Sequence, residues 1–97
     1  MKSTEEFLSI LKKYKIKVQR QYGIVRIGIF GSVARNTQHE ASDVDICLET
    51  TIPNMFDLVH IKEDLQVLFD CKVDIVRMRE GMDVLLKNRI EKEGIYV

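Results

Sequence analysis

The chain has 97 residues, with 15 basic and 15 acidic side chains and a hydrophobic fraction of 45%. This length predicts a single domain over residues 1–97, and the balanced composition excludes a disordered or collagen-like chain. No apolar run approaches the roughly 20 residues of a membrane span, and the polar N-terminus lacks a signal-peptide pattern. The two cysteines match neither a disulfide framework nor a zinc site. We therefore expect a cytoplasmic protein.

Charge is unevenly distributed along the chain. Residues 1–35 carry eight basic and two acidic side chains, whereas residues 36–97 carry seven basic and thirteen acidic ones. A nucleic-acid-binding protein would carry an overall basic excess, so we expect no direct nucleic-acid binding. The split could bring a polyanion and metal ions together on one surface, and solvated faces of unrelated elements explain it equally well.

The pattern of apolar and turn residues predicts an α/β (α+β) fold with helices packed on one face of a small mixed sheet. The first helix is expected to begin with a capping box at Ser3–Glu6 and to end at Gly23. We expect the element order α-β-(short α)-β-α-β-α. The remaining expected elements are strands over residues 24–30, 44–48 and 72–76, a helix opened by Pro53-Asn54, a helix over residues 82–93, and a short strand or tail over residues 95–97.

Two carboxylates stand at the start of the second expected strand. Asp43 and Asp45 are two residues apart, so in a strand they point to the same face at a spacing of about 6–7 Å, while Val44 points to the other face. Like charges this close repel each other unless a cation lies between them. Oxygen ligands of this kind suit a hard divalent ion, Mg²⁺ above all. The alternative is a turn residue at position 43 and an exposed strand residue at position 45.

A second candidate segment, Gly31-Ser32, directly follows the first expected strand. Glycine allows a ligand to approach the backbone closely, and a short helix opened by Ser32 would present free N–H groups to an anion. Ser32 could instead be only a helix N-cap. Arg35, one turn further on, could contact a phosphate, form a salt bridge to the acid-rich half of the chain, or contact a partner.

Asp74 is a lone carboxylate in an otherwise apolar strand. An unpaired buried carboxylate is costly, so Asp74 either faces solvent or binds something. If it shares the face of Asp43 and Asp45, three carboxylates converge, which is enough to hold two metal ions about 3.5–4 Å apart.

Together these motifs resemble the minimal nucleotidyltransferase (MNT) family of the polymerase-beta-like superfamily. Gly31-Ser32 is followed after ten residues by Asp43-Val44-Asp45, and Asp74 lies in a later strand. The resemblance implies nucleotide transfer from ATP to an acceptor hydroxyl. By the resemblance, Gly31 and Ser32 bind the β- and γ-phosphates of the nucleotide, and the catalytic, metal-binding residues are Asp43, Asp45 and Asp74, with two Mg²⁺ ions. We add Arg35 as a candidate nucleotide-binding residue, with its other two roles still open. The sequence departs from the family at Asn36, where relatives often have glycine.

Small stand-alone members of this family resemble antitoxins encoded beside a helical HEPN-type RNase toxin. The resemblance implies that the chain silences such a toxin by transferring AMP to one of its tyrosines. Two alternatives stay open. The chain could neutralise a toxin by occlusion without catalysis, or it could transfer a nucleotide to a small molecule with a homodimer completing the pocket.

Three other reactive side chains are interpreted as non-catalytic. His39 and His60 lack ligand spacing to another His or Cys, so we expect surface or packing roles for both. Cys47 lies one pleat beyond Asp45 with no basic neighbour, which favours packing beside the site over nucleophilic chemistry.

Overall fold

The computed structural model describes residues 2–97 of the chain. Three helices and four strands follow one another in it. Within residues 2–97 no helix combines the length and apolar character that a membrane crossing requires. The elements are α1 (Thr4–Tyr22), β1 (Ile24–Phe30), β2 (Val44–Thr50), α2 (Met55–Phe69), β3 (Val73–Arg77), α3 (Val84–Glu93) and β4 (Ile95–Tyr96).

The strands form one mixed sheet in the order β3-β2-β1-β4. β2 runs antiparallel to β1 and parallel to β3, so the end of β1 lies beside the starts of β2 and β3. The register pairs Phe30 with Asp45, and Asp45 in turn with Asp74. Three segments that are distant in the sequence therefore meet at one end of the sheet.

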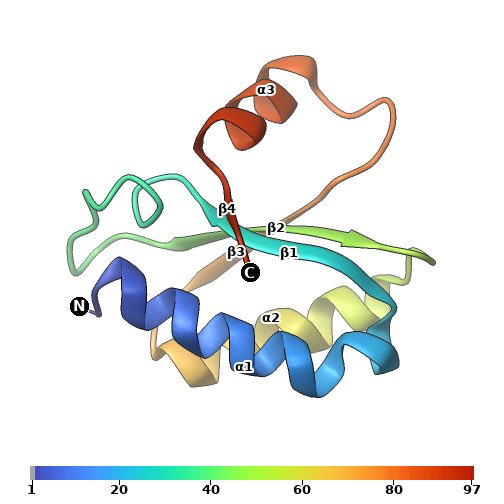
Figure 1. Cartoon of the computed structure of the whole chain (residues 1–97), viewed down its shortest axis with the longest axis horizontal. Coiled ribbons are helices and arrows are strands. Elements are labelled where there is room, and N and C mark those ends of the chain that lie inside the picture. Colours follow the sequence, from blue (N-terminus) through green and yellow to red (C-terminus); the bar gives the residue numbers. More distant parts are fainter. Residues whose placement is uncertain (1) are drawn as a thin grey trace.

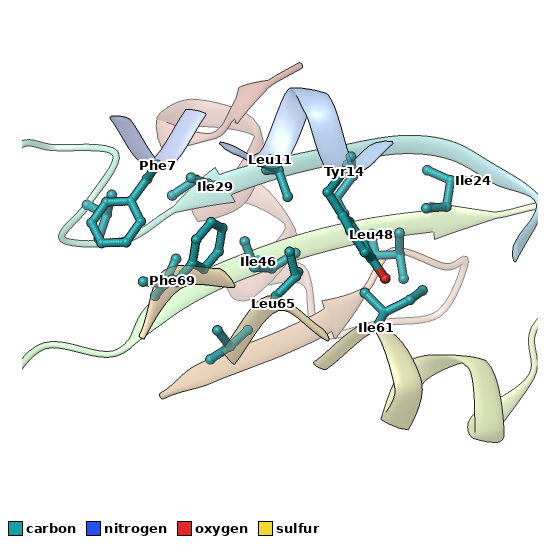
Figure 2. Close-up of a cluster of buried hydrophobic side chains, with 14 of the residues drawn as sticks. Phe7, Leu11, Tyr14, Ile24, Ile29, Ile46, Leu48, Ile61, Leu65 and Phe69 are labelled. Atoms are coloured by element: carbon teal, nitrogen blue, oxygen red, sulfur yellow. The ribbon is translucent and has the colours of Figure 1, made fainter. Parts of the chain in front are cut away.

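α1 and α2 pack against one face of the sheet, as expected (Figure 1). The main hydrophobic core lies between these helices and the sheet, and Figure 2 shows its side chains converging from both layers. Phe7 of α1 meets Phe69 of α2 edge-to-face, with 5.2 Å between ring centroids. From the sheet, this core takes the alternate residues Val44, Ile46 and Leu48 of β2. The opposite face of β2 is thereby left for other contacts.

The expectation that all helices pack on one face of the sheet is wrong for α3. This helix lies over the face opposite α1 and α2 (Figure 1). A second, smaller cluster of buried side chains holds it there. This cluster needs apolar residues from β1 and β2 that point away from the main core, namely Phe30 and Cys47. Its other buried members are Met78, Met82 and Ile90.

The predicted helix ends are confirmed to within a few residues. Ser3 accepts a hydrogen bond from the Glu6 N–H, the Glu6 side chain accepts one from the Ser3 N–H, and Gly23 closes α1 with φ 63°. Asn54 caps α2 through its side chain. α3 begins two residues later than predicted, because the Asp83 side chain caps it by accepting from the Leu86 N–H at 3.0 Å.

The short helix predicted after Gly31 is wrong: residues 31–36 form consecutive turns. A single helical bond, from the Arg35 N–H to the Gly31 carbonyl, forms at 3.1 Å. Asn36 then adopts φ 58°, and the N–H groups of Asn36 and Thr37 bond back to the carbonyls of Val33 and Ser32. This Schellman pattern ends a helix, so it closes the segment after one turn. Asn36 thus adopts the left-handed conformation that glycine reaches most readily and that asparagine tolerates.

Candidate functional site

The three predicted carboxylates lie at the end of the sheet where β1, β2 and β3 meet. Asp43 is exposed directly before β2, Asp45 is half-buried within it, and Asp74 is exposed on β3. Because Val44 and Ile46 point into the main core, Asp45 points to the face of the sheet that α3 covers. The structure thus confirms the predicted alternation along β2. It also makes Asp74 the register neighbour of Asp45.

Neighbouring charged side chains affect the pKa of Asp45. Burial raises the pKa of Asp45, and the nearby negative charge of Asp74 raises it further. Arg89 lowers this pKa in part, Asp43 raises it again, and Arg35 lowers it by the smallest contribution. The net effect is a raised pKa, because burial and the neighbouring carboxylates together outweigh the two guanidinium groups.

Gly31 places backbone directly against the Asp45 side chain. Its φ is +75°, and a Cβ built on it would collide with the Asp45 carboxylate. Any larger residue would therefore displace Asp45 as well as strain the backbone. The turn that follows carries Ser32, which is half-buried. The hydroxyl of Ser32 and the first N–H groups of this turn thus follow directly on the glycine that lies against Asp45.

Arg35 forms an ion pair with Glu93 at the end of α3, with 2.9 Å between Nη1 and Oε2. Of the three roles left open by the sequence, a salt bridge to the acid-rich half of the chain is therefore present. The side chain stays 44% exposed, which leaves it accessible to a ligand.

Two residues near the carboxylates were missed by sequence reasoning. Arg89 of α3 lies over the Phe30 ring at 5.9 Å, and its Nε is 3.4 Å from Glu93 Oε2. The spacing of Arg89 and Glu93, four residues apart on a helix, could have indicated their pairing. No local sequence pattern could have indicated that Glu93 also pairs with Arg35, because the two residues are 58 positions apart in the sequence.

The donor set fits a hard divalent cation in chemistry. Asp43, Asp45 and Asp74 offer only oxygen, which Mg²⁺ prefers. Positive charge between them would offset the burial and the neighbouring charge of Asp74 that raise the pKa of Asp45. Within residues 2–97 no three His, Cys, Asp or Glu side chains are already gathered in a metal-binding arrangement. Because Asp43 and Asp74 are exposed, their side chains have room to reorient around an ion.

Of two hollows on the surface, one is lined by two of these carboxylates and the other by none of them. One of about 590 Å³ borders Asp43 and Asp74 and is lined on its α2 side by Lys62 and Gln66. The Gln66 side chain accepts a hydrogen bond from the Val73 N–H at 3.2 Å, which fixes this wall to β3. The other hollow, of about 640 Å³, is more apolar and lies between α1 and α2, away from the carboxylates. The first is the one beside the candidate site.

The other reactive side chains have the structural roles that were predicted. His39 Nδ1 accepts a hydrogen bond from the Ala41 N–H within the loop before β2. His60 is exposed on α2. Cys47 is fully buried in the second cluster, where burial raises the pKa of its thiol. A buried, protonated thiol is a poor nucleophile.

Comparison with known proteins shows which family the chain resembles as a whole. The sequence model of the nucleotidyltransferase domain family matches residues 11–97. The protein adenylyltransferase MntA of Thermococcus cleftensis is 33% identical over 98 residues, which cover 100% of this chain and 98% of that protein.

Two solved structures share the fold. A protein proposed to be a minimal nucleotidyltransferase superposes with a TM-score of 0.78 at 28% identity, covering 97% of this chain and 95% of that one. A toxin–antitoxin structure containing AMP-PNP superposes with a TM-score of 0.72 at 25% identity, covering 88% of this chain and 70% of that one.

Proposed function

The chain belongs to the nucleotidyltransferase domain family, and from this premise we propose that it is an antitoxin that transfers AMP from ATP to a tyrosine hydroxyl of a partner HEPN-type toxin. The observation that carries the proposal is the position of Asp45, between the backbone of Gly31 and the carboxylate of its register partner Asp74. A phosphate-binding turn and a set of metal-binding carboxylates in contact with each other are what nucleotide transfer requires.

The proposed reaction is an exchange at the α-phosphorus of ATP. The acceptor hydroxyl oxygen forms a bond to this phosphorus, the bond from the phosphorus to the oxygen bridging to the β-phosphate breaks, and pyrophosphate leaves. The hydroxyl proton is released to solvent. Gly31 and Ser32 hold the β- and γ-phosphates, and Arg35 binds the nucleotide beside them. The protein contributes mainly positioning and electrostatic stabilisation.

Asp43 and Asp45 would hold Mg²⁺, and Asp74 would share in holding a second ion close to the acceptor hydroxyl. When bound, these ions neutralise the charge that develops on the α-phosphate and on the departing pyrophosphate. Without cations, three carboxylates would repel a triphosphate. This is why the oxygen-only donor set and the raised pKa of Asp45 support a metal-dependent nucleotide site.

Intact-mass spectrometry of a reconstituted mixture tests the proposal. The purified chain is incubated with ATP, Mg²⁺ and the HEPN-type protein proposed as its partner, and both proteins are weighed. We expect an AMP-sized increment on the partner that is lost in the Asp43→Asn/Asp45→Asn variant. The matched control is Glu63→Gln/Glu91→Gln, which removes two exposed negative charges from other parts of the surface and should retain activity.

The alternatives from the sequence give different results when toxin activity is assayed as well and a small hydroxyl compound is added to the mixture. Neutralisation of the toxin by the Asp43→Asn/Asp45→Asn variant, in a stable complex with no mass change, would establish occlusion and overturn catalysis as the mechanism. Modification of a small hydroxyl compound in place of the partner would overturn the protein acceptor.

A further inference from the structure

We propose that Arg89 is a second phosphate-binding residue of the nucleotide site and that Glu93 is the positioning residue that holds it beside Arg35, an inference that rests on the proposed function. Arg89 and Glu93 are both on α3, the helix that covers the face of the sheet where Asp45 points (Figure 1). The last helix would then supply part of the site as well as covering the sheet.

Glu93 brings two guanidinium groups together. Its Oε2 atom is 2.9 Å from Arg35 Nη1 and 3.4 Å from Arg89 Nε. Two like charges would otherwise separate, so the shared carboxylate fixes both at one place. Glu93 is 22% exposed, compared with 44% for Arg35 and 49% for Arg89. The positioning carboxylate is thus partly buried, while the cations it holds are more exposed to solvent.

This pair of guanidinium groups borders the carboxylates. Arg89 lies over the ring of Phe30, which is the register partner of Asp45 and the residue before Gly31. Arg35 ends the turn that Gly31 begins. The two cations therefore lie next to the turn that is proposed to hold the β- and γ-phosphates.

The way each arginine meets Glu93 leaves donors for a ligand. Arg89 faces Glu93 with its Nε, and within residues 2–97 neither of its Nη groups enters a further ion pair. A guanidinium oriented in this way can present its planar donors to two phosphate oxygens. The carboxylates serve the metal ions, so the distal phosphates need cationic donors of their own. Arg35 and Arg89 are two cations that the structure holds beside the turn begun by Gly31.

A purely structural role is the competing explanation, because the same contacts join α3 to the turn after β1. Ligand chemistry separates the two explanations. A phosphate-binding residue affects binding of the triphosphate group and has little effect on AMP, which lacks the β- and γ-phosphates. A residue with a purely structural role affects the melting temperature and does not change the affinity for AMP-PNP relative to that for AMP.

The experiment is isothermal titration of the whole chain with AMP-PNP and with AMP, each in the presence of Mg²⁺. Arg89→Met should weaken AMP-PNP binding by at least about tenfold, because hydrogen bonds between charged groups are the strong ones, and should change AMP binding by less than about threefold. Arg89→Lys keeps the positive charge but lacks the planar set of guanidinium donors, so it should lose part of the affinity for AMP-PNP. Glu93→Gln should fall between wild type and Arg89→Met.

Lys87→Met is the matched control, since it removes an exposed cation of the same helix that lines a separate hollow with Arg26 and Glu49. It should bind AMP-PNP as the wild type does. If Arg89→Met lowers the melting temperature but binds AMP-PNP with unchanged affinity, the role of Arg89 is structural and the inference is overturned. If the wild type itself does not bind AMP-PNP, the proposed function fails first. The two failures are thus distinguishable without the toxin.

Discussion

Asp45 and Asp74 are direct register partners on the parallel strands β2 and β3. Neighbouring strands lie about 4.8 Å apart, so these two acidic residues are held together by backbone hydrogen bonds before any ligand arrives. Side chains alone would not stay in this arrangement, because burial and the charge of Asp74 both raise the pKa of Asp45. The fold therefore keeps two acidic residues adjacent at an electrostatic cost, and perturbed carboxyl groups of this kind are common at functional sites.

We expect the Asp45→Asn variant to be at least as stable as the wild type near neutral pH. Because the folded-state pKa of Asp45 is raised, the folded state binds its proton more tightly than the unfolded state does. The protonated Asp45 therefore adds to the free energy of unfolding at a pH below its pKa in the unfolded chain. This stabilisation is lost as the pH rises through its pKa in the folded protein. Ionised Asp45 therefore lowers stability at about pH 7, and asparagine removes that cost.

Urea unfolding at about pH 7 and about pH 4 measures this effect. The difference between Asp45→Asn and wild type should be largest at the higher pH and should shrink on acidification. Glu80→Gln, an exposed control outside the candidate site, should show no such difference. A variant less stable than wild type at about pH 7 would mean that Arg89 and Arg35 stabilise the carboxylate more than burial destabilises it.

Local sequence patterns predicted most of the fold because the forces involved are local. Ser3 and Gly23 bound α1 through bonds to residues a few positions away, and Asn54 does the same for α2. The placement of α3 was not predictable in this way. Met82 and Ile90 are apolar at helical spacing, and which face of the sheet they cover depends on contacts with Phe30 and Cys47.

The candidate site shows the same division between local and long-range information. The spacing of Gly31, Ser32, Asp43 and Asp45, with Asp74 downstream, was readable from the sequence, and their roles remain predictions. The ion pair between Arg35 and Glu93 was not readable, because it joins positions 58 residues apart that only the folded chain brings together. The failure of the predicted short helix has a local cause, since Asn36 closes the turn with a positive φ.

The two cysteines should differ sharply in reactivity toward thiol reagents. Cys71 is partly exposed beside Asp43 and Asp70, whereas Cys47 is fully buried beneath α3. Burial raises the pKa of both thiols, so both react slowly, and only Cys71 is accessible in the folded state. Alkylation followed by peptide mass mapping should show modification at Cys71 alone, with Cys47 modified after unfolding in urea. Labelling of Cys47 in the folded protein would contradict its placement in the second cluster.

Tyr14→Phe should lower the free energy of unfolding by about 1 kcal/mol, the net contribution of one hydrogen bond. The Tyr14 hydroxyl donates to Asp64 Oδ2 at 2.7 Å across the interface of α1 and α2. Burial and this bond both raise the pKa of Tyr14, so its hydroxyl should stay protonated through ordinary alkaline titration. A double-mutant cycle with Asp64→Asn isolates the pair, and near-zero coupling would show that the bond does not contribute to stability.

Gly31→Ala should abolish AMP transfer and destabilise the fold, because the new Cβ combines an unfavourable φ with a collision against the Asp45 carboxylate. Gly81 provides a matched control: its φ is +78°, and a Cβ there would meet nothing within 4 Å. Gly81→Ala should therefore lose only the backbone contribution, about 1–2 kcal/mol, and keep its activity. Chemical denaturation and the AMP-transfer assay on both variants separate the effect of backbone strain from the effect of the collision with Asp45. Equal destabilisation with activity retained in both would show that Gly31 serves the turn alone and does not set the position of Asp45.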